Sequence, residues 1–241
     1  MNLSEIRKQL ELSSSVVFFG GAGTSTESNI PDFRTAGGLY NRSDLVNRKP
    51  EELLHIHTLQ NEPENFFAYY RTNLIYPEAQ PNRAHHVLAK WETDGLLNMI
   101  ITQNIDGLHQ KAGSRNVLEL HGSANRNYCM ECHRPATLDH VIQSRTVPRC
   151  SHCQGMVRPD VVLYGEQLDL DVMNKAVSAV RSADFLIVGG TSLVVYPAAG
   201  LISTFSGRNI LLINKEPTVY DHSARWVIHD SIGEVLSQLA Q

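Results

Sequence analysis

The chain has 241 residues, of which 42% are hydrophobic and 19% are charged, a composition typical of a folded protein rather than a disordered one. Its formal net charge of -4 argues against bulk attraction to nucleic acid or to an anionic membrane. The start of the chain lacks an apolar signal segment, and no apolar stretch reaches the roughly 18 residues needed to span a bilayer. We therefore expect a cytoplasmic protein.

The first residues predict a short amphipathic helix, and the apolar run at residues 16–19 predicts a buried parallel strand. A glycine-rich stretch, Gly20 to Arg34, follows this strand. Its glycines allow a tight turn and close approach to a ligand, and the hydroxyls of residues 24–26 suit a phosphate. The dinucleotide-binding fingerprint requires a further glycine where Thr26 stands, however. By itself the stretch fits a nucleotide-binding loop and also a tight turn that binds nothing.

Residues 35–81 differ in character from the sequence around them. They lack strong strand patterns and show helical spacing at residues 51–54 and 65–70, which predicts a helical insertion. We expect the aromatic residues of the second segment to form the core of this insertion. Pro81 and Asn82 then open a helix that is predicted over residues 83–94 and ended by Gly95.

The rest of the chain alternates between strand and helix patterns. Apolar runs predict buried strands at residues 97–102, 117–120, 184–190 and 209–213, with a weaker last strand at 224–228. Helices are predicted at residues 169–181, 197–205 and 232–239, and residues 158–166 are expected to return the chain to the same sheet. Strands that alternate with helices indicate an α/β fold with a Rossmann-like, doubly wound parallel sheet.

Polar or glycine-rich segments follow several of these strands, at residues 103–107, 121–123 and 189–192 and at Asn214. Since ligands of open parallel sheets bind beyond the carboxyl ends of the strands, these segments predict a nucleotide-binding crevice. His121 is a candidate base, because an imidazole with a pKa of about 6.5 needs little adjustment for that role. Taken singly, Asn104 or Asp106 could equally be a helix cap.

All four cysteines belong to two Cys-x2-Cys pairs, Cys129 with Cys132 and Cys150 with Cys153. In a chain without a secretion signal this pattern predicts a zinc site of four thiolates. Four thiolates leave no open coordination position, so we expect a structural and not a catalytic metal. Two redox-active pairs are the alternative.

A series of motifs resembles a known family. They are GAGTSTESNIPDFR from Gly21, TQNIDGLHQKAG from Thr102, LHG at residues 120–122, the two cysteine pairs, RPDVVLYGE from Arg158 and GTSLVVYPAA from Gly190. In this order they resemble the sirtuins of bacterial type, which are NAD-dependent protein lysine deacylases. The resemblance implies a Rossmann-like domain of residues 1–34, 82–124 and 156–241. It also implies a small domain with a helical module, residues 35–81, and a zinc-binding module, residues 125–155.

The resemblance also implies roles for individual residues. His121 would be the general base, assisted by Asn104, and Val161, Gly165 and Glu166 would lie along an acyl-lysine peptide that adds as a strand between the two domains. The NAD-binding set would be Gly21, Ala22, Gly23, Thr26, Asp32, Phe33, Arg34, Gln103, Asn104, Asp106, His121, Gly190, Thr191, Ser192, Asn214 and Ile232.

Two positions depart from the family pattern, which usually has an aliphatic residue at Thr24 and glycine at Asn29. Asparagine tolerates a left-handed backbone, so the second change is mild, and Thr24 is expected to add a hydroxyl near the cofactor. The Tyr-x-x-Arg pair typical of members that act on succinyl or malonyl lysine is missing around residues 67–71. We therefore expect acetyl-lysine to be the preferred substrate.

The implied reaction joins the acyl oxygen of lysine to the ribose carbon of NAD as nicotinamide leaves, and His121 removes a proton from the ribose diol. Its products would be free lysine, nicotinamide and O-acetyl-ADP-ribose. An NAD-dependent mono-ADP-ribosyltransferase or NAD hydrolase is one alternative, and a non-catalytic NAD-sensing zinc protein is another. The segment between the cysteine pairs, residues 133–149, holds too little basic charge to favour DNA binding. The oligomeric state is left open by the sequence.

Overall fold

The structure is a computed structural model in which residues 3–34, 37–41 and 48–241 are described, so that parts of the predicted helical module, residues 35–36 and 42–47, lie outside the described residues. A six-stranded parallel sheet forms the centre of the molecule, in the order β3-β2-β1-β7-β8-β9. The strands are Val16–Gly20 (β1), Met99–Thr102 (β2), Val117–Glu119 (β3), Phe185–Gly189 (β7), Asn209–Ile213 (β8) and Trp226–Ile228 (β9). The predicted α/β fold with a parallel sheet is confirmed.

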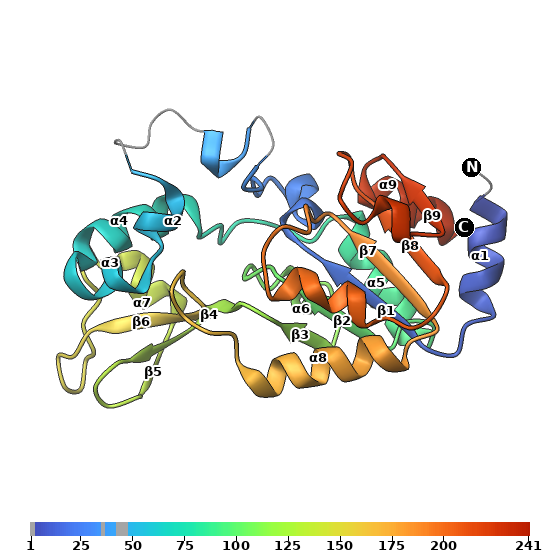
Figure 1. Cartoon of the computed structure of the whole chain (residues 1–241). Coiled ribbons are helices and arrows are strands. Elements are labelled where there is room, and N and C mark those ends of the chain that lie inside the picture. The colour runs from blue at the N-terminus through green and yellow to red at the C-terminus, as the bar shows by residue number, and fades with distance from the viewer. Residues whose placement is uncertain (1–2, 35–36, 42–47) are drawn as a thin grey trace.

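Helices cover both faces of this sheet (Figure 1). On one face, alternate strand residues pack against α1 (Leu3–Glu11), α5 (Arg83–Thr93) and α9 (Ile232–Leu239). On the other face, they pack against α8 (Leu170–Ser182) and the 3-10 helix η4 (Ala198–Thr204). Strands that are buried on both faces read as continuous apolar runs, which is why the sequence revealed them.

The segment Pro197 to Phe205 differs from its prediction, because most of it is a 3-10 helix and not an α-helix. Gly200 lies inside this segment and lowers its α-helical propensity, and the turn is short. The remaining short elements are α6 (Leu108–Lys111) and the 3-10 turns η1 (Ala22–Thr24), η2 (Thr26–Ser28), η3 (Leu39–Asn41) and η5 (Asp221–Ser223). None of the helices in the described part of the chain is long and apolar enough to cross a membrane.

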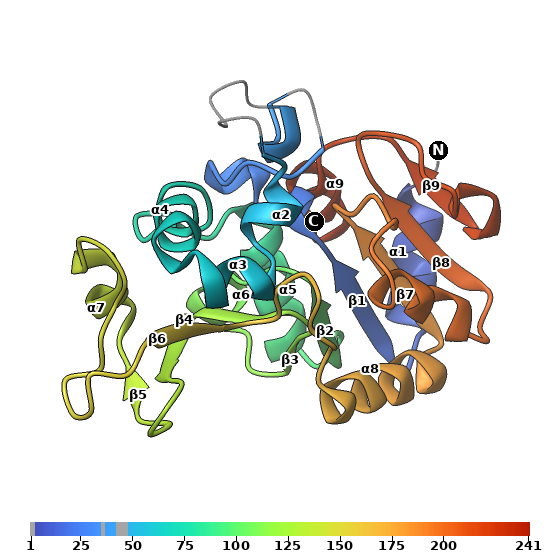
Figure 2. The ribbon, with the colours of Figure 1, turned by 60° about the vertical axis from the view of Figure 1, so that its left-hand side comes forward.

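A second, three-stranded antiparallel sheet lies beside the first, in the order β5-β4-β6 (Figure 2). Its strands are Gly122–Cys129 (β4), Pro135–Ala136 (β5) and Val157–Val161 (β6), and α7 (Leu138–Gln143) lies between the last two in sequence. The prediction that residues 158–166 return to the parallel sheet is therefore wrong. A short apolar strand carries no local signal for which of two sheets it joins, since that depends on its partner strand.

The helical insertion is confirmed for its described residues. It consists of α2 (Pro50–Leu53), α3 (Ile56–Asn61) and α4 (Pro63–Asn73). The buried aromatic rings of α4 form one hydrophobic cluster with residues of β4 and β6, as expected for the core of the insertion. The insertion and the second sheet therefore pack together at one side of the molecule (Figure 2).

Neighbouring strands β1 and β7 come from the two halves of the chain, and the strand order reverses direction between them. In an open parallel sheet such a point leaves a crevice outside the carboxyl ends of the two strands. The glycine-rich segments at residues 20–23 and 189–190 lie at these two strand ends. The topology therefore places both of them at one ligand crevice.

Candidate active site

A cavity of about 1180 Å³ is lined by the loops that follow β1, β2, β3, β7 and β8. Residues of the helical insertion between Leu54 and Tyr76, and residues 161–168 after β6, complete its wall. Every residue that was predicted to bind cofactor or substrate lines this one cavity: Gly21, Ala22, Gly23, Thr26, Asp32, Phe33, Arg34, Gln103, Asn104, Asp106, His121, Val161, Gly165, Glu166, Gly190, Thr191, Ser192, Asn214 and Ile232. Residues scattered over most of the chain are thus brought together.

The two glycine-rich turns pack directly against each other. Gly23 donates its N–H to the carbonyl oxygen of Gly190 at 2.7 Å. A Cβ on Gly23 would lie only 2.8 Å from the Cα of Gly190, so no larger residue fits at this position. The close approach explains the spacing of the glycines after β1, since both turns must share one edge of the cavity.

Thr24 differs from its expectation. Its side chain is fully buried, and its hydroxyl points to the carbonyl oxygen of Gly189 at 3.4 Å instead of lining the cavity. Asn29, by contrast, adopts the expected left-handed backbone with a φ of 63°. The departures from the family pattern at both positions are therefore absorbed by the loop itself.

A buried polar network joins the loops after β1 and β2. The Ser25 hydroxyl donates to the carboxylate of Asp106 at 2.6 Å, and the side-chain amide of Asn104 donates to the Ser25 oxygen at 3.0 Å. The second carboxylate oxygen of Asp106 accepts from the N–H of Leu108, the first residue of α6. Burial raises the pKa of Asp106, and these hydrogen bonds offset only part of that rise. Asp106 is therefore a cavity residue that also bonds the first N–H of α6, while the N-cap residue of that helix is Gly107.

His121 lies directly after β3 and its ring is held by the loop after β2. Its Nδ1 atom is 2.8 Å from the main-chain oxygen of Gln103. Because a carbonyl oxygen can only accept, the neutral ring carries its proton on Nδ1 and leaves the Nε2 lone pair available. Burial lowers the pKa of His121, and the hydrogen bond to Gln103 offsets only part of that effect. The imidazole is therefore neutral at physiological pH and can accept a proton.

The loop that contains Asp32, Phe33 and Arg34 reaches across to the loop after β7. The N–H of Arg34 donates to the carboxylate of Asp32 at 3.0 Å, and its guanidinium lies 3.4 Å from the Ser192 hydroxyl. Farther along the rim, Glu27 accepts hydrogen bonds from the Ser231 hydroxyl and the N–H of Gly233 at the start of α9. These contacts fix the loop after β1 to two other edges of the cavity.

The predicted substrate segment is held by a buried ion pair. The two terminal guanidinium nitrogens of Arg158 donate to the two carboxylate oxygens of Glu166, at 2.7 and 2.8 Å. Burial opposes ionisation of Glu166, but the Arg158 guanidinium lowers the pKa of this carboxyl below its ordinary value. Glu166 also accepts from the N–H of Leu163, so its carboxylate holds the turn instead of facing a ligand.

The turn after β6 is close to the loop after β3 and to the helical insertion. The N–H of Val162 donates to the main-chain oxygen of His121 at 3.0 Å. Gly165 has a φ of +87°, and a Cβ there would lie 2.6 Å from the ring of His55. Only glycine fits this position, because the backbone is left-handed and the space is filled.

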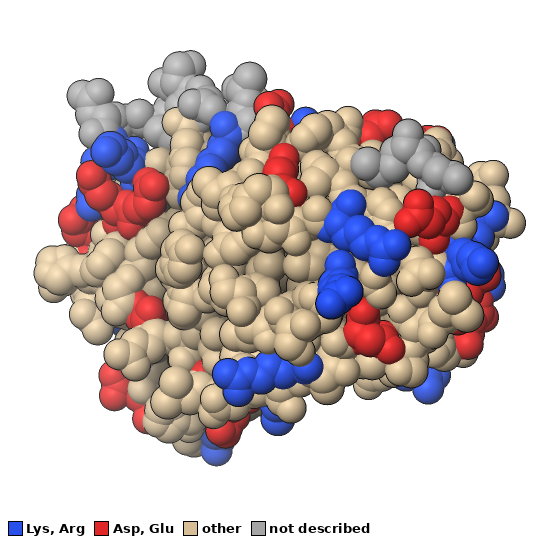
Figure 3. Space-filling model, turned by 45° about the vertical axis from the view of Figure 1, so that its right-hand side comes forward, with Lys and Arg blue, Asp and Glu red and all other residues tan. Residues whose placement is uncertain are grey.

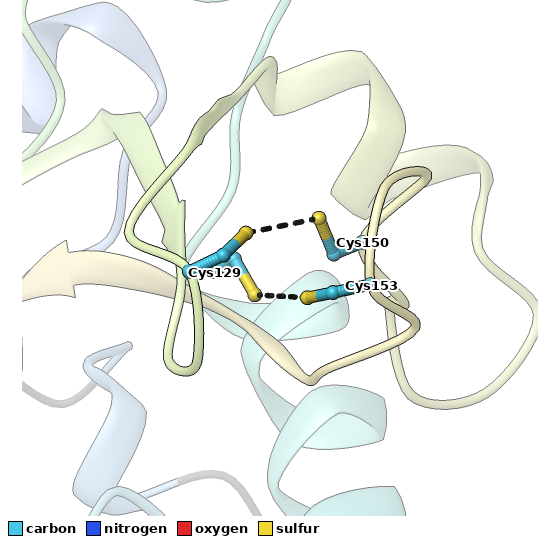
Figure 4. A group of neighbouring side chains, drawn as sticks. Cys129, Cys150 and Cys153 are labelled. Carbon is cyan, nitrogen blue, oxygen red and sulfur yellow. Dashed lines mark hydrogen bonds between the residues drawn. The ribbon is translucent and has the colours of Figure 1, made fainter.

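The four cysteines form a cluster in which all sulfur atoms lie within 4.8 Å of one another. Cys129 and Cys153 are 3.4 Å apart and Cys132 and Cys150 are 3.7 Å apart, so each contact joins the two sequence pairs (Figure 4). A tetrahedral zinc ion with Zn–S bonds of about 2.3 Å separates its sulfur atoms by about 3.8 Å, whereas a disulfide bond is about 2.05 Å. The cluster therefore fits a structural zinc site and not two redox pairs.

Some residues of the cavity were missed by sequence reasoning. Ser25 was noted only as one of three hydroxyls, and Tyr40 and Tyr164 were not singled out at all, although all three line the cavity. Ser25 could have been found from its place in a hydroxyl-rich turn after a strand. The two tyrosines have no local signal, since their importance depends on a contact between distant segments.

Comparisons with known proteins agree with this geometry. A model of the Sir2 family matches residues 21–197. The chain is 55% identical over 235 residues to a protein of Clostridium acetobutylicum named NAD-dependent protein deacetylase. The matched region covers 97% of this chain and 96% of that protein. A protein of Clostridium perfringens with the same name is 52% identical over 238 residues and covers 98% of both chains.

Solved structures agree as well. A Sir2 structure with a p53 peptide and NAD+ is 36% identical to this chain, with a TM-score of 0.87, over 99% of this chain and 97% of the other. A Sir2 structure with a deacetylated p53 peptide and 3'-O-acetyl ADP ribose has a TM-score of 0.91 at the same identity and coverage.

Proposed function

The chain belongs to the Sir2 family and is an NAD-dependent protein deacetylase, and we propose that His121 is the general base of its reaction. We further propose that NAD lies along the loops that follow the parallel strands, and that the acyl-lysine peptide lies along residues 161–166. The observation that carries this proposal is the convergence of His121, the two glycine-rich turns and the turn after β6 on one cavity.

The residues present fit a dinucleotide. The close-packed glycine turns carry no side chains that would fill their edge of the cavity, and the Ser25–Asn104–Asp106 network presents fixed polar side chains at another. NAD supplies a glycosidic bond with a good leaving group, so that nicotinamide and O-acetyl-ADP-ribose are the products that accompany free lysine. We assign Asn104 and Asp106 to the nicotinamide and ribose end, and Gly190, Thr191, Ser192, Asn214 and Ile232 to the phosphates and adenosine.

His121 acts through its Nε2 atom. The carbonyl of Gln103 holds the ring by Nδ1, and burial keeps the ring neutral, so Nε2 can take a proton from a ribose hydroxyl. Because burial lowers the pKa of His121 below the ordinary value for histidine, kcat/KM should stay constant on acidification to a lower pH than an ordinary histidine base would allow. It should fall at lower pH, where the ring becomes protonated and can no longer accept a proton.

The peptide is proposed to add as a strand beside residues 161–166, which the Arg158–Glu166 pair and the helical insertion hold in place. We favour acetyl-lysine over acidic acyl groups, because the Tyr-x-x-Arg pair typical of members that act on succinyl or malonyl lysine is missing around residues 67–71 of α4. Proteins that carry acyl-lysine are the partners expected of this family.

The test is to replace His121 by alanine and to measure nicotinamide release and O-acetyl-ADP-ribose by mass spectrometry with an acetyl-lysine peptide. We expect turnover to fall by roughly 10²–10⁴-fold, the usual contribution of a general base. His222→Ala, at an exposed position outside the cavity, is the control and should keep full activity.

Near-wild-type deacetylation by His121→Ala would remove His121 from the mechanism. Free ADP-ribose as the sole product of the wild-type chain would indicate an NAD hydrolase, and ADP-ribosylated protein would indicate an ADP-ribosyltransferase. NAD binding without any turnover would indicate a sensor.

Several further properties are proposals of the same kind. We propose that the small domain comprises residues 35–81 and a zinc-binding module that extends beyond the implied residues 125–155 to residues 122–161, since β4 and β6 pair with each other and not with the parallel sheet. We propose a cytoplasmic location, because cysteines that form a metal site and not disulfides are typical of a reducing compartment. Basic and acidic side chains are interspersed on the face shown in Figure 3, which favours protein over nucleic acid as the partner.

A further inference from the structure

Two tyrosine hydroxyls meet across the cavity wall. The Tyr40 oxygen lies 2.7 Å from the Tyr164 oxygen, although the two residues are 124 positions apart in sequence. Tyr40 belongs to η3, in the segment that follows the proposed NAD-binding residues, and Tyr164 belongs to the turn after β6. The pair is therefore a direct link between the segment assigned to NAD and the segment assigned to the peptide.

Tyr40 is firmly attached to the residues assigned to NAD. Its N–H donates to the carbonyl oxygen of Phe33 at 2.9 Å, and the N–H of Leu39 donates to that of Asp32 at 2.8 Å. Its ring meets the ring of Phe33 edge to face, with centroids 5.7 Å apart, and the Arg34 guanidinium lies 5.3 Å from the Tyr40 centroid. Any displacement of Tyr40 therefore moves Asp32, Phe33 and Arg34 with it.

Tyr164 is attached equally firmly to the other side of the cavity. Its N–H donates to the carbonyl oxygen of Leu54 at 3.1 Å, and its own carbonyl oxygen accepts from the N–H of Ile56 at 2.9 Å. Both main-chain groups of Tyr164 are therefore bonded to the helical insertion, so a peptide strand would pair with the main chain of other residues in this segment. What Tyr164 contributes to the cavity is its side chain, which is 36% exposed.

We propose that the Tyr40–Tyr164 hydroxyl pair is a positioning contact that holds Asp32, Phe33 and Arg34 in the arrangement that binds NAD. This inference rests on the proposed function for the places of NAD and of the peptide. Of the described residues between Arg34 and Tyr40, Gly37 is exposed and Gly38 and Leu39 are buried, and holding such a segment in one conformation on ligand binding costs conformational entropy. A contact that orders the segment beforehand removes part of that cost and so raises the affinity for NAD.

The contact is a neutral hydrogen bond. Burial and the hydrogen bond to Tyr164 both raise the pKa of Tyr40, so its hydroxyl stays protonated at physiological pH. One neutral hydrogen bond changes an equilibrium by roughly 2- to 10-fold. The chemical step itself does not involve either tyrosine, so its rate constant at saturating substrates should change much less.

The experiment compares the full-length chain with Tyr40→Phe, Tyr164→Phe and the double variant. Calorimetric titration with NAD, in the absence of peptide, gives the dissociation constant without any turnover. Each single variant should weaken NAD binding by roughly 2- to 10-fold, and the double variant should be no weaker than the single variants, since one bond is lost in every case. In steady-state assays the KM for NAD should rise while kcat stays within about 2-fold of wild type.

A matched control is available in the same molecule. Tyr196 and Tyr220 form another hydroxyl pair, at 3.3 Å, and Tyr220 lies outside the cavity lining. Tyr220→Phe makes the same chemical change and should leave NAD binding unaltered.

Wild-type NAD affinity in both single variants would overturn the inference, and so would effects that multiply in the double variant. If Tyr40→Phe fails to fold in thermal melts, Tyr164→Phe alone decides the question, because it changes only the hydroxyl of a partly exposed ring. A wild-type chain that binds NAD but does not deacetylate would reject the proposed function, while the calorimetric comparison would still test the hydroxyl pair.

Discussion

Two histidines in the hydrophobic core should make the fold sensitive to acid. His85 of α5 and His109 of α6 are 0% and 1% exposed, and their ring centroids are 4.7 Å apart. Within the described part of the chain, both ring nitrogens of His109 lack a hydrogen-bond partner. The Nε2 atom of His85 lacks one as well. Burial lowers the pKa of His109 to about 4, and burial together with the neighbouring histidines lowers that of His85 to about 3.

The sign of the effect follows from these shifts. In the unfolded chain both histidines titrate near pH 6.5, so at lower pH the unfolded state takes up protons that the folded state excludes. Each histidine therefore contributes its full stabilisation above pH 6.5, and this is lost as the pH falls from 6.5 towards the folded values. Linkage gives a loss of about 1.2 kcal/mol for each histidine between pH 6 and pH 5, or about 2.4 kcal/mol for both.

The assay is urea unfolding of the wild-type chain and of His109→Phe at pH 7, 6 and 5. The variant removes one of the two titrating rings, so its loss of unfolding free energy between pH 6 and pH 5 should be smaller than that of wild type by about 1.2 kcal/mol. The comparison uses the change in the free energy of unfolding with pH. Any pH-independent packing cost of the larger phenylalanine ring therefore cancels. His222→Phe, at an exposed position, should behave like wild type.

An identical loss of stability between pH 6 and pH 5 in wild type and His109→Phe would refute the reasoning. It would mean that His109 is protonated in the folded state, or that other groups govern the response to acid.

Two further predictions concern the small domain. Glu166→Gln should lower the free energy of unfolding by roughly 1.5–3 kcal/mol and raise the KM for the acetylated peptide, because it weakens the bonds to the buried Arg158 guanidinium. Thermal melts and peptide kinetics measure this, and unchanged values for both would contradict the positioning role of Glu166. Cys129→Ala should release zinc and unfold the small domain, since such a site contributes folding energy. Elemental analysis and circular dichroism measure this, and a metal-free variant with full activity would argue against a structural site.

Much of the site could be predicted because its parts follow individual strands. The turns after β1 and β7, the polar residues after β2 and His121 after β3 all lie at carboxyl ends of parallel strands, which a parallel sheet must bring to one edge. The zinc ligands are likewise marked by local spacing within each pair, although only the fold brings the two pairs together.

Predictions failed where the outcome depended on contacts between distant segments. The strand β6 was assigned to the wrong sheet because its partner, β4, is what determines its place. Thr24 was expected near the cofactor, but the turn rotates its hydroxyl towards Gly189. Neither outcome has a signal in the residues next to these positions.

The sequence by itself determined the parallel sheet, the zinc ligands and the strand ends that carry the cavity residues, because apolar periodicity and ligand spacing act over a few neighbouring residues. The tertiary structure alone decided which polar atoms meet. Ser25 bonds Asp106, Arg158 bonds Glu166 and Tyr40 bonds Tyr164. The first and last of these join segments that lie far apart in the chain, and the direction of each side chain depends on packing that forms only when the whole chain folds.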